Sequence, residues 1–512
     1  MMSKNEIGRT EAYMFDLNEL KTYREGNRLE AKKALGRDGQ GELPRSVWET
    51  VSAFANTAGG VIVLGVSERR DDGSFIVHGI PKAEKVLDDF WNAALSEDKL
   101  SARFMRDADA TVETVEGKDI VVIRVPWVDR HMRPIFINDS IFGGTFRRTH
   151  TGDHQCKREE VLSMLRDSDT SSQDAAIAES ARVEFINRET VAAYRRRFDQ
   201  RNEGHVWGKA DDETFLTNIG ALRVDEKGGL RPTRAGLLMF GEDRWITYEF
   251  PHYFLDYRQE AGAVERWADR FTSQPGDWTG NVYDFYFRVY NKLKAALKVP
   301  FRLDGVDRVD DTPAHEALRE AIVNALTNAN WFDRRGVVCV WDDEAITIAN
   351  PGDFRMPVEE AKKPGSTDPR NETMMRMFAM VEIGERAGSG MDKIFGGWAW
   401  AGYAEPSYEV AYGPDRTTLT LPLVSADSAG EAPSKTVEDR RRPSKCGDDS
   451  LTDAQRAVLN YLEANGPSRT AEIAQGIKMG TSQTNVLLRG LTELGFVSVS
   501  GATSARRYRL HD

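Results

Sequence analysis

Two polar side chains, Glu320 and Asn324, lie four residues apart in a stretch whose apolar residues recur with helical spacing. Thr312 is a suitable N-cap and Pro313 is tolerated in the first turn, so a helix is predicted over residues 313–331. On this helix Glu320 and Asn324 share a face that borders the apolar stripe. A carboxylate and an amide at the edge of a core are placed to line a cleft rather than to meet bulk water.

Two further sequence features in the same region favour a phosphate-binding site. A hairpin is predicted from residues 336–341 and 345–350, and it runs into Asn350-Pro351-Gly352. Gly388-Ser389-Gly390 then opens a predicted helix, and small residues at a helix start leave backbone N–H groups free to bind phosphate. Each signal alone has an ordinary explanation, a solvated helix face or a simple turn. Their order along the chain favours a nucleotide site.

The ordered set resembles the Bergerat-type nucleotide-binding domain, an α/β sandwich shared by gyrases, histidine kinases and MutL. It is most similar to the divergent version found in Schlafen-like and RecG-related bacterial proteins. The segments that carry the resemblance are REAIVNALTNANW, ITIANPG, RNETMMRMFAMVEIGERAGSGMDKI and AGYAEPSYEV. Together they span roughly residues 311–423.

The resemblance implies a role for each residue of the set. Asn324 would ligate a Mg²⁺ ion that bridges the phosphates of ATP, and Glu320 would orient or deprotonate a hydrolytic water. Gly388, Ser389 and Gly390 would let the backbone approach the phosphates.

The other end of the predicted site departs from the family pattern. Asn350, which precedes Gly352 in the predicted nucleotide site, stands where many relatives carry the aspartate that accepts the adenine amino hydrogen. An asparagine can accept through its oxygen but lacks the charge, so selectivity for adenine stays open. The resemblance also implies that residues 364–371 lie in a lid over the nucleotide.

The first part of the chain, residues 16–165, is predicted to be a separate α/β unit. Helices are predicted at 17–23, 43–58 and 158–165, and strands at 25–32, 61–66, 120–125 and 142–149. The segments EGNRLEAK, TVSAFANTAGGVIVLGVSE and GTFRRTHT resemble the AlbA-type Schlafen domain.

In Schlafen proteins with nuclease activity, carboxylates at corresponding positions form a metal site. The matching residues here are Glu25, Glu30 and Glu68, with Lys32 placed to offset charge on a scissile phosphate. Hard divalent cations such as Mg²⁺ or Mn²⁺ take oxygen ligands, and two of them about 4 Å apart can assist phosphodiester cleavage. The alternative is a domain that only binds nucleic acid or protein, since Glu68 lies in an exposed-looking turn and the family usually has aspartate there.

The remaining segments complete the predicted organisation of a multidomain α/β (α+β) chain. Residues 166–184 are small and polar and are predicted to be a linker, and residues 185–300 form a connecting region. The nucleotide domain is assigned to residues 301–424. Residues 425–450 lack large apolar side chains and are predicted to be a flexible tether.

Residues 451–512 form a predicted winged helix-turn-helix. Helices are predicted at 453–465, 469–476 and 481–494, followed by a wing at 496–500 and 505–510. The segment has seven Lys and Arg against five Asp and Glu, so it is basic in a chain of net charge −12. Such modules also serve in dimerisation or docking. The predicted nucleic-acid contacts of the whole chain are Arg147, Arg148, Gln483, Asn485, Arg489, Arg506, Arg507 and Arg509.

Composition narrows the function classes. Because the net charge is −12, any contact with DNA or with tRNA or other RNA must come from a local basic patch. Cys156, Cys339 and Cys446 are odd in number and widely spaced, which indicates no zinc cluster or disulfide framework and fits a reducing cytoplasm. No signal peptide or membrane span is predicted. We expect a homo-oligomer.

Two function classes follow from these predictions. The first is an ATP-gated nuclease, with phage defence as one setting. The second is a nucleotide-sensing transcriptional regulator that binds DNA without cleaving it. The two classes differ in what they require of Glu25, Glu30 and Glu68. The nuclease needs these three carboxylates to converge, whereas the regulator does not.

Overall fold

The computed structural model divides the chain into two compact units, residues 1–429 and 430–512. It describes residues 25–426 and 453–510, except 70, 97, 150–151, 261–266, 298–302, 305–306, 309–310, 364, 385–389, 478, 481–483, 485–486, 489–490, 493–496 and 501–506. The helix predicted at 17–23 and the tether predicted at 425–450 therefore lie almost wholly outside the described residues. None of the described helices is both long and apolar enough to cross a membrane.

The first unit begins with a four-stranded sheet in the order β1-β2-β6-β5, in which β1 and β2 are parallel and the other pairs antiparallel. The elements of this part are β1 (Leu29–Lys32), α1 (Val47–Ala55), β2 (Gly60–Leu64), β3 (Val66–Glu68), β4 (Phe75–Val77), α2 (Ala83–Ala94), β5 (Ala110–Val115), β6 (Lys118–Val125), β7 (Phe146–Thr149), β8 (Gly152–Gln155) and α3 (Arg158–Asp167).

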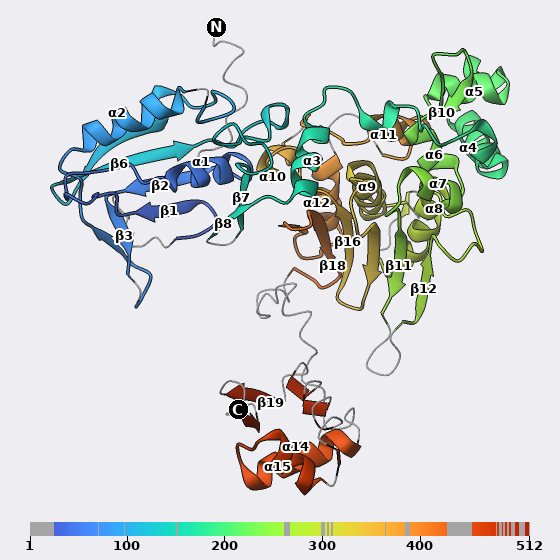
Figure 1. Ribbon diagram of the computed structural model, residues 1–512. Coiled ribbons are helices and arrows are strands. Elements are labelled where there is room, and N and C mark those ends of the chain that lie inside the picture. The colour runs from blue at the N-terminus through green and yellow to red at the C-terminus, as the bar shows by residue number, and fades with distance from the viewer. Residues whose placement is uncertain are drawn as a thin grey trace. The chain divides into compact units, whose positions relative to one another are not determined.

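Both faces of this sheet are covered, which explains the unbroken apolar run of β2. Ile62 and Leu64 pack with α1 and α2 on one face (Figure 1), whereas Val61 and Val63 pack with the β3–β4 hairpin on the other. The strands predicted at 61–66 and 120–125 and the helices at 43–58 and 158–165 are thus present, with ends shifted by a few residues.

The second part of this unit is built on a six-stranded sheet in the order β12-β11-β15-β16-β18-β17 (Figure 1). Its elements are α4 (Arg188–Arg201), α5 (Asp212–Ile219), β9 (Leu222–Val224), β10 (Leu230–Pro232), α6 (Arg234–Phe240), α7 (Asp243–Glu249), β11 (Leu255–Gln259), β12 (Asp269–Thr272), α8 (Val282–Leu293), β13 (Leu303–Asp304), β14 (Asp307–Arg308), α9 (Pro313–Asn328), β15 (Val337–Trp341), β16 (Ala345–Pro351), α10 (Val358–Ala361), α11 (Glu372–Met380), α12 (Gly390–Trp400), β17 (Ser407–Ala411) and β18 (Arg416–Pro422).

The predicted boundary at residue 300 does not divide this core. β11 pairs in parallel with β15, so the connecting region supplies two strands of the same sheet as the predicted nucleotide domain. One hydrophobic cluster joins both regions. Strand β11 starts at Leu255, a few residues after α7 ends.

The predicted linker at 166–184 is also packed against this core. Asp174 is 2% exposed, and its carboxylate accepts hydrogen bonds from the backbone N–H groups of Thr373 and Met374 at the start of α11. Small polar residues serve here to cap a helix N-terminus, where free N–H groups favour a carboxylate. Composition alone does not distinguish this use from a solvated linker.

The second unit contains α14 (Asp453–Asn465), α15 (Thr470–Gly476) and an antiparallel pair of strands, β19 (Val497–Ser500) and β20 (Arg507–Leu510). Its core is made by Val458, Leu462, Ile473, Leu488, Leu491, Val497 and Tyr508. Most of the helix predicted at 481–494 lies outside the described residues, so the winged helix stays a prediction.

Candidate functional site

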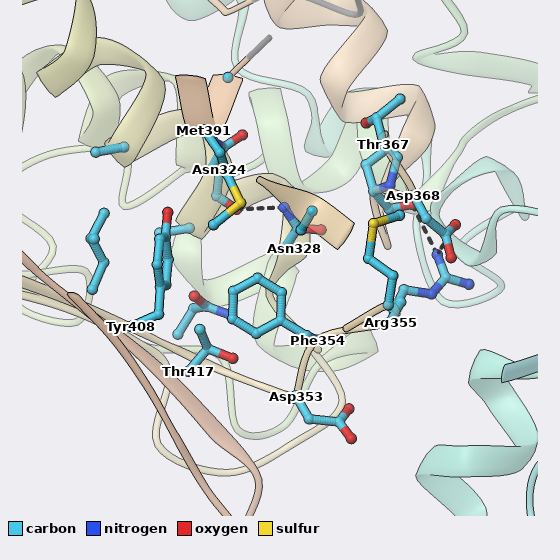
Figure 2. Close-up of a pocket in the computed structure, with 18 of the residues that line it drawn as sticks. Asn324, Asn328, Asp353, Phe354, Arg355, Thr367, Asp368, Met391, Tyr408 and Thr417 are labelled. Atoms are coloured by element: carbon cyan, nitrogen blue, oxygen red, sulfur yellow. Dashed lines mark hydrogen bonds and ion pairs between the residues drawn. The ribbon is translucent and has the colours of Figure 1, made fainter. Parts of the chain in front are cut away.

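A pocket opens between α9, the β16–β18 face of the sheet and the segments that follow β16 (Figure 2). Its polar or aromatic lining includes Asn324, Asn328, Asn350, Asp353, Phe354, Arg355, Thr367, Asp368, Tyr408 and Thr417.

Helix α9 brings the first two predicted residues to this region. Apolar residues such as Leu318 and Ile322 anchor its buried face, and Glu320 is itself only 3% exposed. The helix ends at Asn328, three residues earlier than predicted, because Ala329 takes an extended backbone.

Gly390, the first residue of α12, lies directly against both polar side chains. A Cβ atom at this position would lie 3.1 Å from Asn324 Nδ2 and 3.2 Å from Glu320 Oε2. The predicted carboxylate, amide and glycine therefore converge, although they are separated by up to 70 residues along the chain. Gly388 and Ser389 lie outside the described residues.

The floor of the pocket is formed by two cross-strand partners, Asn350 on β16 and Thr417 on β18. Asn350 is buried, lines the pocket, and its Nδ2 donates to Pro351 O at 3.2 Å. Thr417 donates to Gly352 O at 2.9 Å. Gly352 has φ +99°, a conformation that other residues rarely adopt, and a Cβ there would clash with Arg370.

The segment predicted as a lid, residues 364–371, lies partly in the pocket lining and partly in the core. Thr367, Asp368 and Pro369 line the pocket, but the next two residues are buried and fixed. Arg370 donates to Asn328 O at 2.6 Å, and Asn371 donates to Thr327 O and Ala329 O. These bonds satisfy carbonyl groups at the C-terminal end of α9, where a cation is also favoured by the helix dipole.

The carboxylates of the first domain form an ion-paired cluster. Glu30 accepts from Lys32 Nζ at 2.7 Å and from Arg148 Nη2 at 2.7 Å. Burial raises the pKa of Glu25, and the charges of Glu30 and, less strongly, Glu68 raise it further, so the three acids lie near one another. Glu68 itself is exposed.

The divalent metal site at these residues stays a prediction. In the described part of the chain, no group of three or more His, Cys, Asp or Glu side chains could hold a metal ion. The charge of Glu30 is compensated by Lys32 and Arg148. In this structure Glu30 therefore belongs to an ionic cluster around Arg148.

The ionic cluster around Arg148 predicts the effect of Glu30→Gln on stability. We expect the variant to lower the free energy of unfolding by about 1–3 kcal/mol, because Arg148 is 1% exposed and loses a charged partner. Urea denaturation followed by tryptophan fluorescence measures this change. Glu159→Gln, at a carboxylate that is 71% exposed, is the control and should leave stability unchanged. An unchanged free energy of unfolding would contradict this structural role of Glu30, and cleavage of RNA or DNA that requires Mg²⁺ or Mn²⁺ and is lost in Glu30→Gln would support the predicted metal site.

Arg147 and Arg148, predicted to contact nucleic acid, lie in the interior instead of on the surface. Both side chains are nearly fully buried, and each is used to join segments. Arg148 binds Glu30, Asp153 and the carbonyl of Gly26. Basic residues in a polar strand can be buried when each has a carboxylate partner, which the local sequence does not show.

Of the predicted nucleic-acid residues in the second unit, the structure describes Arg507 and Arg509. Both are exposed on β20, and each makes one local bond, to Pro467 O and Ser498 Oγ respectively. Gln483, Asn485, Arg489 and Arg506 lie outside the described residues. Their contact with nucleic acid stays a prediction.

Several pocket residues were not predicted from the sequence. Asp353, Phe354 and Arg355 follow directly after Asn350-Pro351-Gly352, and Thr417 pairs with Asn350 across the sheet. Asp353, Phe354 and Arg355 could have been found from the sequence, because they directly follow the Asn-Pro-Gly turn. Thr417 has no comparable local signal, because it reaches the pocket only through strand pairing.

Three family models match parts of the chain. The Schlafen AlbA_2 model matches residues 25–157, and a domain of unknown function, DUF8451, matches residues 162–256. A model described as "Putative ATP-dependent DNA helicase recG C-terminal" matches residues 338–421. No curated protein matches the chain significantly.

Two solved structures are similar to the chain. The DIP2311 protein from Corynebacterium diphtheriae is 16% identical, with 94% of this chain and 92% of that chain covered and a TM-score of 0.39. The N-terminal domain of a "Putative ATP-dependent DNA Helicase RecG-related Protein" from Nitrosomonas europaea is 32% identical, with 27% of this chain and 89% of that chain covered and a TM-score of 0.21.

The chain is thus a multidomain protein of mixed helix and strand content. It contains a Schlafen AlbA_2 domain and, further along, a domain of the RecG C-terminal type. The match to the second domain begins in β15, so α9 with Glu320 and Asn324 lies before it.

Proposed function

We propose that the protein binds Mg²⁺–ATP in the pocket between α9 and the sheet and uses this binding to regulate its association with nucleic acid. The convergence of Glu320, Asn324 and Gly390 at one end of the pocket carries the proposal. Asn350 and Thr417 supply polar groups on the floor for a base. The matches to Schlafen and RecG-type domains support a nucleic-acid partner.

The site fits a nucleotide-bound Mg²⁺ ion. Asn324 offers an amide oxygen, and Mg²⁺ typically takes only one or two protein ligands when it is held by phosphates and water. Bound there, the ion would neutralise phosphate charge. Glu320, a buried carboxylate one helical turn away, is placed to orient a water molecule near the phosphates.

We favour regulation of binding over cleavage. The residues of the Schlafen AlbA_2 domain that would hold a catalytic metal are paired with Lys32 and Arg148. A nucleotide-sensing regulator that binds DNA through Arg507 and Arg509 therefore agrees with the structure better than a nuclease. The homo-oligomer remains part of this proposal, since a symmetric DNA reader commonly acts as a dimer.

Calorimetry with the full chain tests the nucleotide site. ATP with Mg²⁺ should release heat with a single class of site, and ADP and GTP show whether Asn350 selects the base. Duplex DNA, single-stranded DNA and tRNA are then titrated with and without ATP. Absence of binding by all three nucleotides would remove the proposal, and nucleic-acid affinity that is independent of nucleotide would remove its regulatory part.

Gly390→Ala should weaken nucleotide binding about tenfold, because a site must be held within about 0.5 Å of its working geometry. The added Cβ would lie within 3.2 Å of Asn324 and Glu320, so both side chains must shift. Calorimetry with ATP measures the loss. Gly396→Ala on the same helix meets nothing within 4 Å and is the matched control.

Gly396→Ala should bind ATP as the wild type does and gain about 0.5–1 kcal/mol of stability, since alanine is the better helix former. Equal affinities for Gly390→Ala and Gly396→Ala would show that Gly390 does not lie against the bound nucleotide.

A further inference from the structure

We propose that the Schlafen AlbA_2 domain sets the nucleotide affinity of the pocket by holding two of its walls through Arg130 and Arg147. This inference rests on the proposed function, because it names a regulator of that same site. Neither arginine touches the ligand space. Both are positioning residues that act through aspartates of the pocket lining.

The first wall consists of Thr367, Asp368 and Pro369. Arg130, from the short 3-10 helix η3 (Arg130–Met132), binds Asp368 with two hydrogen bonds, Nε to Oδ2 at 2.6 Å and Nη2 to Oδ1 at 3.1 Å. Bidentate arginine–carboxylate pairs fix geometry as well as charge. The wall residue Asp368 is therefore oriented by a residue of the other domain.

Arg130 is itself held firmly. Its Nη1 donates to Asp167 O at 2.5 Å and to Asp169 O at 2.9 Å, at the end of α3. One guanidinium thus joins the Schlafen AlbA_2 domain, the segment after α3 and the pocket wall. A movement of any of these parts changes the position of Asp368.

The second wall follows β16 and includes Asp353. Arg147 donates to Asp353 Oδ2 at 3.0 Å and to both carboxylate oxygens of Asp415, at 2.5 and 2.6 Å. All three side chains are at least 89% buried. An ion pair in this environment costs much to break, because each charge would remain desolvated.

Arg355 lies between the two walls, and its ion pairs are longer than those of Arg130 and Arg147. Its closest carboxylate oxygens are 3.5 Å away on Asp368 and 3.8 Å away on Asp167. Burial and the adjacent charge of Arg370 lower the pKa of Arg355 to about 10. Figure 2 shows its guanidinium beside Asp368 at the edge of the pocket.

The whole group, which we name the arginine–aspartate cluster, has five cations and four anions. Its members are Arg130, Arg133, Arg147, Arg355 and Arg370 with Asp167, Asp353, Asp368 and Asp415. A ligand that meets these walls is consequently linked to the docking of the Schlafen AlbA_2 domain.

Linkage between two sites is reciprocal. If docking through Arg130 strengthens nucleotide binding, nucleotide must strengthen the docking by the same factor. The coupling can therefore be measured in two ways. One is the nucleotide affinity of the pocket, and the other is the protection of backbone amides in the Schlafen AlbA_2 domain from hydrogen exchange.

The test compares full-length wild type, Arg130→Ala, Arg130→Lys and Arg334→Ala by calorimetry with Mg²⁺–ATP. We expect Arg130→Ala to weaken binding about tenfold, within the usual range of coupling between sites. Arg130→Lys keeps the charge but not the bidentate geometry and should show a smaller loss. Arg334→Ala removes an exposed pair with Glu159 away from the pocket and should bind as the wild type does.

Hydrogen–deuterium exchange supplies the reciprocal measurement. ATP should slow amide exchange around residues 130–133 in the wild type, and this effect should shrink in Arg130→Ala. If both Arg130 variants bind nucleotide with wild-type affinity and the effect of ATP on amide exchange is the same as in the wild type, this inference is overturned but the proposed function stands. A wild type that binds no nucleotide would overturn the proposed function as well.

Discussion

Asn324→Ala should weaken Mg²⁺–ATP binding by about 100-fold or more, the equivalent of roughly 3 kcal/mol. The substitution removes the amide oxygen that is placed for the metal, and it removes the side chain that lies against Gly390. Because most of the amide is at the pocket surface, the fold should be retained. Calorimetry measures the affinity, and thermal unfolding checks the fold.

Glu320→Gln complements Asn324→Ala, because it separates ATP hydrolysis from ATP binding. It should bind ATP with nearly unchanged affinity but lose any hydrolysis, because a neutral amide cannot deprotonate or orient water as a carboxylate does. Release of inorganic phosphate is the readout. Wild-type affinity in Asn324→Ala would show that nucleotide, if bound, lies elsewhere on the protein.

Arg370→Ala should lower the free energy of unfolding by about 3–5 kcal/mol, the usual cost of leaving a buried charge without its partner. Arg370 makes two hydrogen bonds to Asp167, at 2.9 and 2.8 Å, and a third to Asn328 O. All 11 tryptophans precede residue 401, so urea denaturation followed by tryptophan fluorescence reports on the first unit alone.

Arg201→Ala is the matched control for Arg370→Ala. Arg201 pairs with Glu382 at 2.8 Å, but the two side chains are 48% and 57% exposed. Exposed pairs contribute little, so the loss should stay below about 1 kcal/mol. Similar losses for the two variants would mean that the buried cluster is not a major source of stability.

The sequence was most informative where local rules apply. Helix α9 could be predicted from its N-cap, its proline and its apolar spacing, and β2 and β6 from β-branched runs. The boundary at residue 300 could not be predicted in the same way. The pairing of β11 with β15 joins distant segments, and strand partners are chosen by the whole core rather than by either strand.

In the candidate site, too, some residues could be predicted from the sequence and others could not. Glu320, Asn324 and Gly390 could be proposed because their spacing and residue types resemble a known family, and the two polar side chains do lie against Gly390. The burial of Arg147 could not be predicted, since an exposed arginine and an arginine paired with Asp415 look alike in sequence. Buried ion pairs between distant segments carry no local pattern.

The parallel pairing of β11 with β15 has a consequence for synthesis on the ribosome. Roughly 80 residues separate the paired positions Leu255 and Val337, so β11 leaves the ribosome several seconds before its partner exists. Until then its hydrogen-bonding edge toward β15 is open, and only the antiparallel neighbour β12 can cover the other edge. Non-local strand pairing is slow, and open edges recruit other chains. The nascent chain should therefore need a chaperone most during translation of residues 260–340, and a ribosome stalled in this interval should yield an aggregation-prone intermediate.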